Sequence, residues 1–292
     1  MKRTRMGKLD LWVTEFCFGT LPMGPLQAQV SHDDGVHLIQ KAWENGVRFF
    51  DTAESYQTYD YLRSALGNFP EAVIATKSTA TSYKDMEQSI TTALHQLGRD
   101  SIDIFHLHAA RATPTVFEER KGAFQCLKEY QKKGLIQAIG ISTHAVDVVE
   151  TAAEIPGIDV IFPIINLDGM GIIRGNTASM IKAIKKAYHH GKGIYAMKVL
   201  AGGHCIDRIS DAITFVRNIR EISSIAIGVV RDVELEYHLR LFDNQPIPQE
   251  IKEKCIDRKK KRLVTIGYCR KCQRCVETCP AGALSLEAGT IV

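Results

Sequence analysis

Eight short runs of apolar, often β-branched residues recur along the first part of the chain, and amphipathic stretches separate them. Apolar runs of this length between helical patterns are typical of parallel strands that are buried on both faces. The expected strands are 16–19, 47–51, 72–77, 102–108, 138–142, 160–166, 193–198 and 225–228. The expected helices are about 33–45, 58–67, 84–98, 114–133, 145–153, 176–190, 208–221 and 233–242. Eight strand–helix units within about 230 residues favour an α/β fold closed into a (β/α)8 TIM barrel over an open doubly wound sheet.

Local signals predict where several of these helices begin and end. Ser31 precedes the first helix as a capping hydroxyl, and two aspartates follow in the first turn, where negative charge stabilises exposed N–H groups. Glycine accepts the left-handed conformation that ends many helices. We expect this role at four glycines: Gly46, Gly67, Gly134 and Gly191.

Composition is that of a folded globular chain, with 45% hydrophobic and 24% charged residues, which excludes a disordered or fibrous protein. No run of about 18 apolar residues is present, so we expect no membrane span. The basic N-terminus lacks a long apolar stretch and a cleavage site, which argues against a secretion signal. We therefore expect a cytoplasmic protein.

Charge is distributed unevenly along the chain. Residues 252–274 hold ten basic and two acidic side chains, which leaves the rest of the chain with a net charge of −4. The asymmetry and two prolines divide the chain into a barrel at 1–242, a linker at 243–254 and a C-terminal segment at 255–292. The basic segment is either a solvated charge run, a surface for an acidic partner, or compensation for an anionic cofactor. Nucleic acid is disfavoured because no nucleic-acid-binding motif accompanies it.

Four reactive side chains follow three adjacent expected strands, at the barrel end where active sites lie. Asp51 ends one strand and Tyr56 follows in its loop, while Lys77 and His108 end the next two. We expect Asp51 to hold Lys77 charged, and Lys77 to lower the pKa of the Tyr56 phenol. His108 would orient a carbonyl oxygen and Tyr56 would protonate it as hydride reaches the carbon. His106 is interpreted as a satisfied side chain of the barrel interior.

This pattern resembles the aldo-keto reductase family over roughly residues 5–242. The resemblance is carried by GTLPMG at 19–24, GVRFFDTAESY at 46–56, IATKS at 74–78, DIFHLH at 103–108 and GLIQAIGISTH at 134–144. It implies an enzyme that uses NADPH or NADH to reduce an aldehyde or ketone, or to oxidise an alcohol, without a catalytic metal. The Asp–Tyr–Lys–His set is the catalytic tetrad of that family.

The resemblance also implies cofactor-binding positions, although they match less closely. Ser142 and Thr143 correspond to a Ser–Asn pair that holds the carboxamide, and Phe162 replaces an amide-binding glutamine. A carboxylate at Glu234 disfavours a 2′-phosphate and favours NADH, whereas Arg231 can partly compensate. The implied set is Gly19, Thr20, Ser142, Thr143, Asn166, Leu200, Gly202, Gly203, Gly228, Arg231 and Glu234.

Four of the eight cysteines fall in the run CRKCQRCVETCP at residues 269–280. Spacing of C-x2-C-x2-C-x3-C-P is typical of ferredoxin-type iron–sulfur ligation and predicts one 4Fe–4S cluster on Cys269, Cys272, Cys275 and Cys279. A zinc site is the main rival, although it usually has two separated C-x2-C knuckles. The fourth cysteine of such a run often binds a second cluster, so Cys255 or a cysteine of another subunit stays an alternative to Cys279. This barrel-then-ferredoxin order resembles an iron–sulfur branch of the aldo-keto reductases.

These features together favour an oxidoreductase of a small carbonyl or alcohol substrate, with an attached cluster. The alternative is an electron-transfer or redox-sensing protein, built on a nucleotide-binding barrel with little turnover. In that reading the basic segment attracts an acidic electron carrier such as a ferredoxin.

Overall fold

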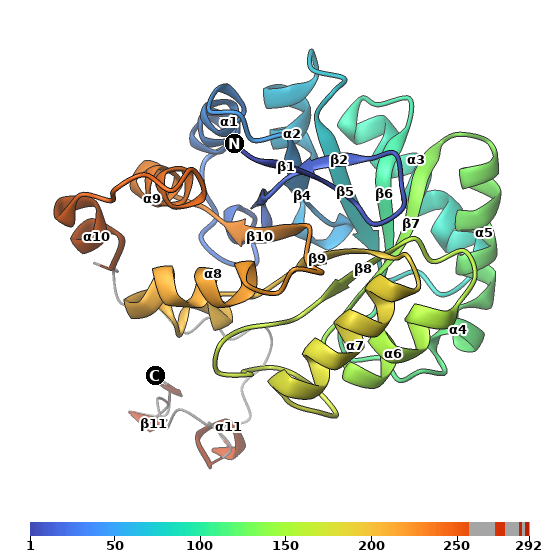
Figure 1. Cartoon of the computed structure of the whole chain (residues 1–292). Coiled ribbons are helices and arrows are strands. Elements are labelled where there is room, and N and C mark those ends of the chain that lie inside the picture. Colours follow the sequence, from blue (N-terminus) through green and yellow to red (C-terminus); the bar gives the residue numbers. More distant parts are fainter. Residues whose placement is uncertain (257–271, 278–285, 288–289, 292) are drawn as a thin grey trace.

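A closed barrel of eight parallel strands forms the centre of the computed structural model, which describes residues 1–256, 272–277, 286–287 and 290–291 (Figure 1). The strands follow each other around the barrel in chain order, and the last pairs with the first through Ile225–Gly228 beside Phe16–Gly19. All eight expected strands are confirmed. They are β3 (Phe16–Gly19), β4 (Phe49–Asp51), β5 (Val73–Ser78), β6 (Ile102–His108), β7 (Ile136–Thr143), β8 (Val160–Pro163), β9 (Gly193–Ala196) and β10 (Ser224–Gly228).

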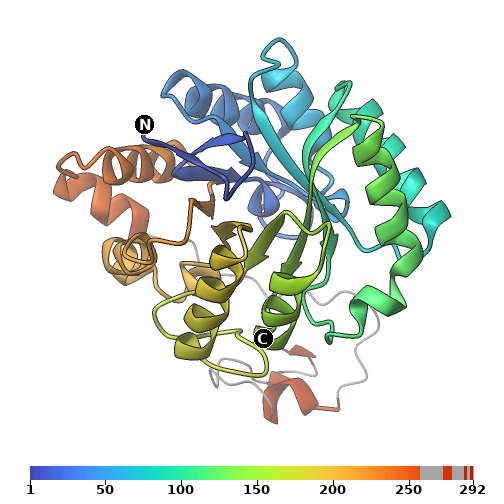
Figure 2. The ribbon, with the colours of Figure 1, turned by 45° about the vertical axis from the view of Figure 1, so that its right-hand side comes forward.

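Helices surround the barrel and bury an apolar face against the outside of its strands (Figures 1 and 2). They are α1 (His32–Glu44), α2 (Tyr59–Leu66), α3 (Tyr83–Leu97), α4 (Val116–Glu119), α5 (Lys121–Lys132), α6 (Val146–Glu154), α7 (Thr177–His189), α8 (Ile209–Arg217) and α9 (Asp232–Phe242). The eight expected helical stretches are confirmed, except that the fourth breaks at Arg120 into α4 and α5.

Helix ends follow the expected caps with one exception. Ser31 accepts a hydrogen bond from the backbone N–H of Asp34, as a capping hydroxyl should. The glycines after α1, α5 and α7 have positive φ and turn the chain out of the helix. Gly67 is different: its φ of −56° is right-handed, so the left-handed turn expected there is wrong. A Cβ at this position would lie 2.7 Å from the carbonyl oxygen of Arg63, so a larger residue would be too close to the helix end.

A hairpin that the pattern did not predict lies at the N-terminal end of the chain. Strand β1 (Arg3–Arg5) pairs antiparallel with β2 (Trp12–Thr14). Three of its apolar side chains, Met6, Leu11 and Val13, pack into the same buried cluster as the inward-facing residues of the barrel. The hairpin therefore supplies apolar contacts to the barrel interior, away from the strand ends that carry the reactive residues.

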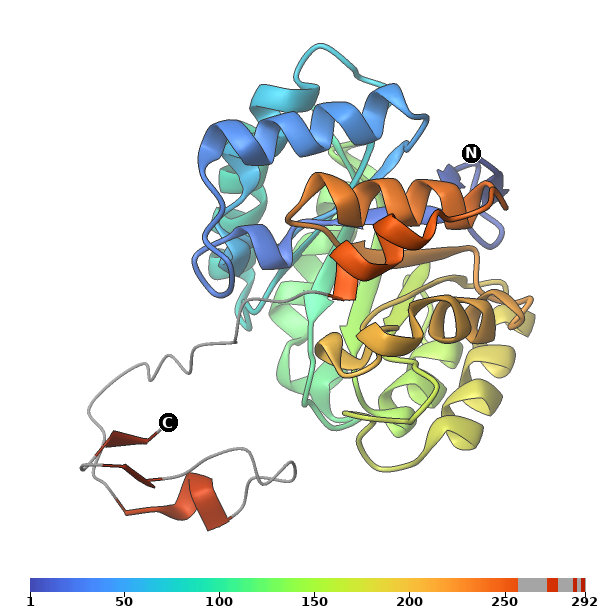
Figure 3. The same ribbon diagram turned by 90° about the vertical axis from the view of Figure 1, so that its left-hand side faces the viewer.

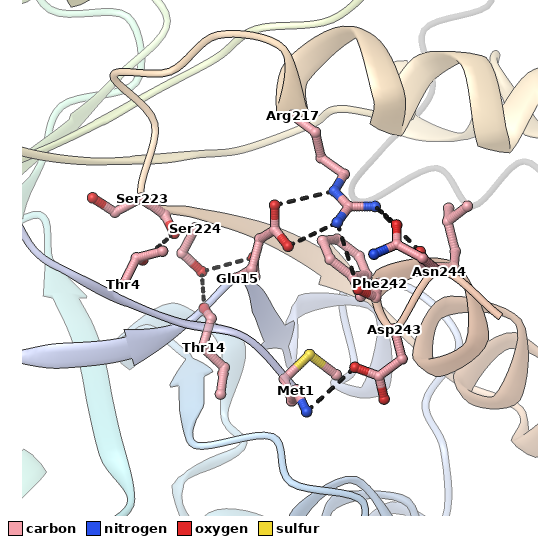
Figure 4. A network of polar contacts seen from close by, with 11 residues as sticks. Met1, Thr4, Thr14, Glu15, Arg217, Ser223, Ser224, Phe242, Asp243 and Asn244 are labelled. Carbon is pink, nitrogen blue, oxygen red and sulfur yellow. Dashed lines mark hydrogen bonds and ion pairs between the residues drawn. The ribbon is translucent and has the colours of Figure 1, made fainter.

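An ion pair fastens the junction between the hairpin and the last helices (Figure 4). Arg217, at the end of α8, donates from Nε and Nη2 to the two carboxylate oxygens of Glu15, each at 3.0 Å. Its remaining amine donates to the carbonyl of Leu241 and to Asn244 Oδ1. Beside it, the Ser224 hydroxyl donates to the carbonyl of Thr14 at 2.7 Å. These bonds hold α8, α9 and the seam between β10 and β3 together.

Residues assigned to a linker include a further helix, α10 (Gln249–Ile256), which packs against α9 (Figure 3). The two prolines end the preceding turn and Pro248 stands just before the helix, a place where a missing N–H costs nothing. Cys255, at the end of α10, is fully buried. Irregular chain therefore covers only about the first half of the expected linker.

The described part of the C-terminal segment comprises a short helix, α11 (Arg274–Glu277), and two strands, β11 (Leu286–Glu287) and β12 (Thr290–Ile291), that pair antiparallel. Among the residues that the structure describes, every helix is too short or too polar to cross a membrane.

We expect the barrel to lose stability in acid, and His238 to be one cause. This α9 side chain lies between Phe16 and Tyr237, is 3% exposed, and its Nδ1 has no partner within the described chain. Burial lowers its pKa from 6.5 to about 4. Below pH 6.5 this histidine is protonated in the unfolded chain but stays neutral in the folded chain. The free energy of unfolding therefore falls as the pH drops towards 4, by about 3 kcal/mol from this group.

The substitution His238→Phe should flatten this decline, because phenylalanine keeps the ring contacts and binds no proton. Urea unfolding at pH 7, 6, 5 and 4 measures the effect, with the exposed His95→Gln as the control. An identical slope in the His238→Phe and wild-type proteins would show that His238 is not a source of the acid sensitivity.

Candidate active site

The structure brings the four predicted reactive side chains to one end of the barrel. Asp51 is the last residue of β4, Lys77 stands next to last in β5, and His108 ends β6. Tyr56 ends the short 3-10 helix η2 (Glu54–Tyr56) that follows β4. The residue after it, Gln57, has a left-handed φ of 55°, which turns the chain sharply behind the phenol.

The centre of the site is a buried ion pair. Lys77 Nζ donates to Asp51 Oδ1 at 2.7 Å and to the carbonyl of Thr52 at 2.5 Å, and the two side chains are 1% and 5% exposed. Burial alone would lower the pKa of Lys77, but the Asp51 carboxylate raises it above the ordinary value. Burial also raises the pKa of Asp51, and the ammonium offsets part of that rise. The geometry therefore keeps Lys77 as a cation directly beneath the phenol.

Tyr56 is held by contacts with both neighbours. Lys77 Nζ lies 4.8 Å from the centroid of its ring, and its ring meets that of His108 edge-on at 6.3 Å. The pKa of Tyr56 is raised, because burial outweighs the attraction of Lys77 and the Asp51 charge adds to the rise. The net lowering expected from the sequence is wrong in this respect. The phenol consequently keeps its proton at neutral pH, as a proton donor must.

His108 is a neutral imidazole. Burial, followed by the positive charge of Lys77, lowers its pKa to about 3. Its Nδ1 is buried and has no hydrogen-bond partner among the described residues. A neutral imidazole donates a hydrogen bond from one nitrogen without adding charge to the site.

A cavity of about 300 Å³ opens beside these groups, lined by Glu54, Ser55, Lys77, Thr79 and His108. Glu54 was not among the site residues expected from the sequence. Its Oε2 accepts hydrogen bonds from the Ser78 and Ser89 hydroxyls at 2.7 and 3.0 Å. A carboxylate two residues before the phenol was visible in the sequence, but its partners lie 24 and 35 residues away.

His106 and Tyr195 form a second buried layer under the ion pair. The Tyr195 hydroxyl donates to Asp51 Oδ2 at 2.9 Å and lies 2.7 Å from His106 Nε2. His106 Nδ1 has no partner within the described chain, so the expected satisfied histidine is satisfied at only one nitrogen. From the sequence, Tyr195 was expected only as part of a strand. The presence of a tyrosine in an otherwise apolar run was the one feature that could have indicated a polar contact in the barrel interior.

Residues expected at the nicotinamide lie on β7 and after β8. The Ser142 hydroxyl is buried without a partner among the described residues, which fits a group that awaits a carboxamide. Thr143 Oγ1 accepts the N–H of Ala145 at 3.2 Å. The Asn166 amide bonds the backbone of Met170 in both directions, at 2.8 and 2.9 Å, so its polar atoms are engaged in shaping a loop.

Gly19 and Gly228, also expected to bind the cofactor, end the neighbouring strands β3 and β10. Gly19 pairs with Gly228 in register, and a Cβ on Gly228 would come within 2.3 Å of Pro22 Cγ. Thr20 Oγ1 donates to the carbonyl of Asp51 at 3.2 Å, so it supports the strand end that carries the ion pair.

The loop after β9 carries the remaining glycine pair. Gly202 and Gly203 have φ of +65° and +98°, and a Cβ on Gly202 would meet no atom of the described residues within 4 Å. The N–H of Gly203 donates to the carbonyl of Leu200 at 2.7 Å, which closes a tight turn. Two adjacent glycines with positive φ leave this turn without side chains, which would let a phosphate approach its backbone closely.

Arg231 and Glu234 have partners of their own. Glu234 accepts the N–H of Val230 and Arg231 Nε, both at 2.9 Å. The Arg231 amines donate to the carbonyls of Lys254 and Cys255, at 3.1 and 3.2 Å. The loop expected at the adenosine is thereby joined to the end of α10.

The cysteines fall into two environments. Cys255 is 1% exposed, its thiol donates to the carbonyl of Val233, and burial raises its pKa to about 11. Cys272, before α11, and Cys275, within it, are exposed and free, while Cys269 and Cys279 lie outside the described residues. Within the described ranges, no three potential ligands are grouped for a metal.

Two curated relatives each match about half of the chain. Pyridoxal 4-dehydrogenase of Microbacterium luteolum is 26% identical over 206 residues, covering 54% of this chain and 60% of that protein. Methylglyoxal reductase of Escherichia coli is 30% identical over 143 residues, covering 47% and 50%. The chain thus spans about half to three fifths of the length of these curated relatives.

A solved structure matches the fold over a larger part of the chain. The holo form of an aldo-keto reductase from Bacillus halodurans superposes with a TM-score of 0.70 at 17% identity. It covers 87% of this chain and 95% of that one, and at this identity it shows the fold.

The sequence profile of the aldo/keto reductase family matches residues 15–237. This region contains all eight barrel strands and the four residues at their ends, and it stops before α10 and the cysteine run. The chain therefore belongs to the aldo/keto reductase family.

Proposed function

We propose that the protein is an NAD(P)-dependent oxidoreductase that interconverts an aldehyde or ketone and the corresponding alcohol. The buried Asp51–Lys77 pair carries this proposal, because it fixes a cation beside a protonated phenol at the edge of a cavity. A neutral imidazole, in edge-on contact with the phenol ring, completes the site.

In the reduction direction, Tyr56 and His108 bind the carbonyl oxygen of the substrate. Both offer hydrogen-bond donors, which orient the carbonyl and withdraw electron density from its carbon. The nicotinamide, when bound, supplies the hydride. Tyr56 gives its proton to the developing alkoxide, and Lys77 stabilises the negative charge left on the phenol oxygen. In alcohol oxidation the same proton returns to Tyr56.

The residues that would hold the nicotinamide cofactor are compatible with it. The unpartnered Ser142 hydroxyl would bind the carboxamide, and the glycine turn at 202–203 would lie against the pyrophosphate. Thr143 and Asn166 would act indirectly, since their polar atoms already bond backbone groups. We leave the substrate at the level of a small carbonyl or alcohol.

We further propose that the C-terminal run binds one 4Fe–4S cluster through Cys269, Cys272, Cys275 and Cys279. The spacing of these thiols supports this, and two of them are exposed and free three residues apart. The buried thiol of Cys255, which bonds a carbonyl, favours Cys279 over Cys255 as the fourth ligand. The basic residues at 252–274 would attract an acidic electron carrier such as a ferredoxin.

Replacing Tyr56 by phenylalanine should lower carbonyl reduction about 10²-fold or more, the usual scale for losing a general acid. Nucleotide binding should change little, because the ring and its contacts remain. Steady-state turnover of a generic aldehyde and fluorescence titration of NADPH measure the two effects. The control is Tyr59→Phe, which removes another buried hydroxyl three residues away, bonded to Thr76. Wild-type turnover in the Tyr56→Phe protein would remove Tyr56 from the mechanism.

The substitution Glu234→Gln should shift cofactor preference towards NADPH. It removes a negative charge beside the expected 2′-position while an amide oxygen can still accept the Val230 N–H. We expect the NADPH:NADH ratio of kcat/KM to rise roughly tenfold, or about 1.4 kcal/mol. Glu236→Gln, on the same helix but paired with Arg240, is the control. An unchanged ratio would place Glu234 away from the ribose.

The substitution Cys272→Ser should abolish iron and sulfide binding, the broad visible absorbance and the reduced-state EPR signal of anaerobically purified protein. Cys126→Ser, a buried thiol on α5, is the control for cluster loss. Nicotinamide-dependent turnover should survive within about an order of magnitude, since hydride transfer moves two electrons and a single cluster normally passes one. Collapse of turnover with circular dichroism unchanged would put the cluster in the catalytic path and favour the electron-transfer alternative.

A further inference from the structure

A chain of three hydrogen-bonded side chains runs beneath the reactive groups, from β6 through β9 to β4. His106 Nε2 lies 2.7 Å from the Tyr195 hydroxyl, and that hydroxyl donates to Asp51 Oδ2 at 2.9 Å. His106 and Tyr195 are wholly buried and Asp51 is 4% exposed. The same carboxylate holds Lys77 through its other oxygen. Asp51 is therefore shared between the reactive ammonium above and a polar pair below.

The direction of the protons in this chain follows from the chemistry of its members. The Tyr195 hydroxyl has one hydrogen and gives it to the Asp51 carboxylate. Its oxygen can then only accept, so the hydrogen between it and His106 belongs to His106 Nε2. Burial, followed by the charge of Lys77, lowers the pKa of His106 far below 6.5 and keeps the ring neutral. The chain is thus a row of neutral donors pointing at one anion, and each bond polarises the next.

The barrel makes specific room for this arrangement. Gly140 stands opposite His106 in the β6–β7 register, and a Cβ there would lie 2.2 Å from His106 Nδ1. The Tyr195 ring stacks on Phe162 with centroids 3.8 Å apart and planes within 12°. His106 Nδ1 has no partner among the described residues, and a buried polar atom without a partner is costly enough to suggest a functional role for the side chain.

We propose that Tyr195 and His106 are positioning residues for the reaction: they hold Asp51 aligned and anionic, and through it set the Lys77–Tyr56 acid. The inference rests on the proposed role of Tyr56. Both residues lie below the ion pair and neither lines the cavity of about 300 Å³, so they act through Asp51 rather than on the substrate.

Loss of the Tyr195 donor changes the charge that Tyr56 experiences. Without it Asp51 Oδ2 has no donor among the described residues, and its negative charge is less dispersed. Asp51 already raises the pKa of Tyr56, so the phenol should become a weaker acid. The titratable groups that face this centre are Asp51, Tyr56, Lys77, Cys17, His106 and His108.

The first test is Tyr195→Phe in the full-length protein. We expect kcat to fall roughly tenfold, the effect of about one pKa unit in the acid, with KM and nucleotide affinity within about twofold. In alcohol oxidation, the pH at which kcat/KM stops rising should move up by about 0.5 unit or more. Tyr59→Phe is the matched control, because it removes a buried hydroxyl that does not touch Asp51.

A double-mutant cycle separates positioning from mere packing. His106→Leu removes the donor to Tyr195, and His106→Gln offers an amide donor in its place. If His106 acts through Tyr195, the pair Tyr195→Phe and His106→Leu should be no slower than Tyr195→Phe alone, and His106→Gln should restore most of the activity.

Additive losses, or an unchanged pH profile in Tyr195→Phe, would overturn the inference while leaving the role of Tyr56 intact. Full activity in Tyr56→Phe would instead overturn the proposed function. If His106→Leu does not fold, the pH profile of Tyr195→Phe and the activity of His106→Gln still test the inference, since each of these substitutions changes few atoms.

Discussion

The site depends on keeping one ammonium charged although its side chain is buried. Lys77 and Asp51 are both buried. In the protein interior an isolated charge is strongly disfavoured, and an ion pair is stable only with good geometry and further hydrogen bonds. The carbonyl of Thr52 and the hydroxyl of Tyr195 supply those bonds. These bonds offset the cost of burial, and they fix a positive charge 4.8 Å from the centroid of the Tyr56 ring.

The barrel supplies this geometry because its parallel register fixes the height of each side chain. Asp51 on β4 pairs with Ala75 on β5. Lys77 lies two residues beyond Ala75 on β5, and its side chain extends to the Asp51 carboxylate on the neighbouring strand. His106 pairs with Lys77 and Gly140, which places the imidazole one layer below the rim and His108 at it. His106 and His108, two residues apart on β6, therefore have different surroundings. His108 lines the cavity, whereas His106 is linked to Asp51 through Tyr195 below it.

What could be predicted from the sequence reflects how local the signals are. The apolar runs of strands such as Ile102–His108 and the reactive residues at their ends are visible within a few positions, because a parallel strand is buried throughout and the barrel rim carries the chemistry. The link from Tyr195 to Asp51 joins residues 144 apart, and no local pattern records it. The right-handed conformation of Gly67 and the hydrogen bonds of the Asn166 amide could not be predicted from the sequence. The residue type shows which conformations and hydrogen bonds are possible, but neighbours in space determine which of them form.

The barrel is connected to the C-terminal segment through helix α10 and its contacts with Arg231. Helix α10 ends at Ile256, directly before the basic approach to the cysteine run, and its final carbonyls bind Arg231. Arg231 is in turn held by Glu234, in the loop where the adenosine end of a nucleotide is expected. Guanidinium hydrogen bonds to helix-end carbonyls satisfy groups that otherwise need water and favour the negative end of the helix dipole. The Arg231 guanidinium therefore links Glu234, at the start of α9, to the end of α10, from which the C-terminal segment continues.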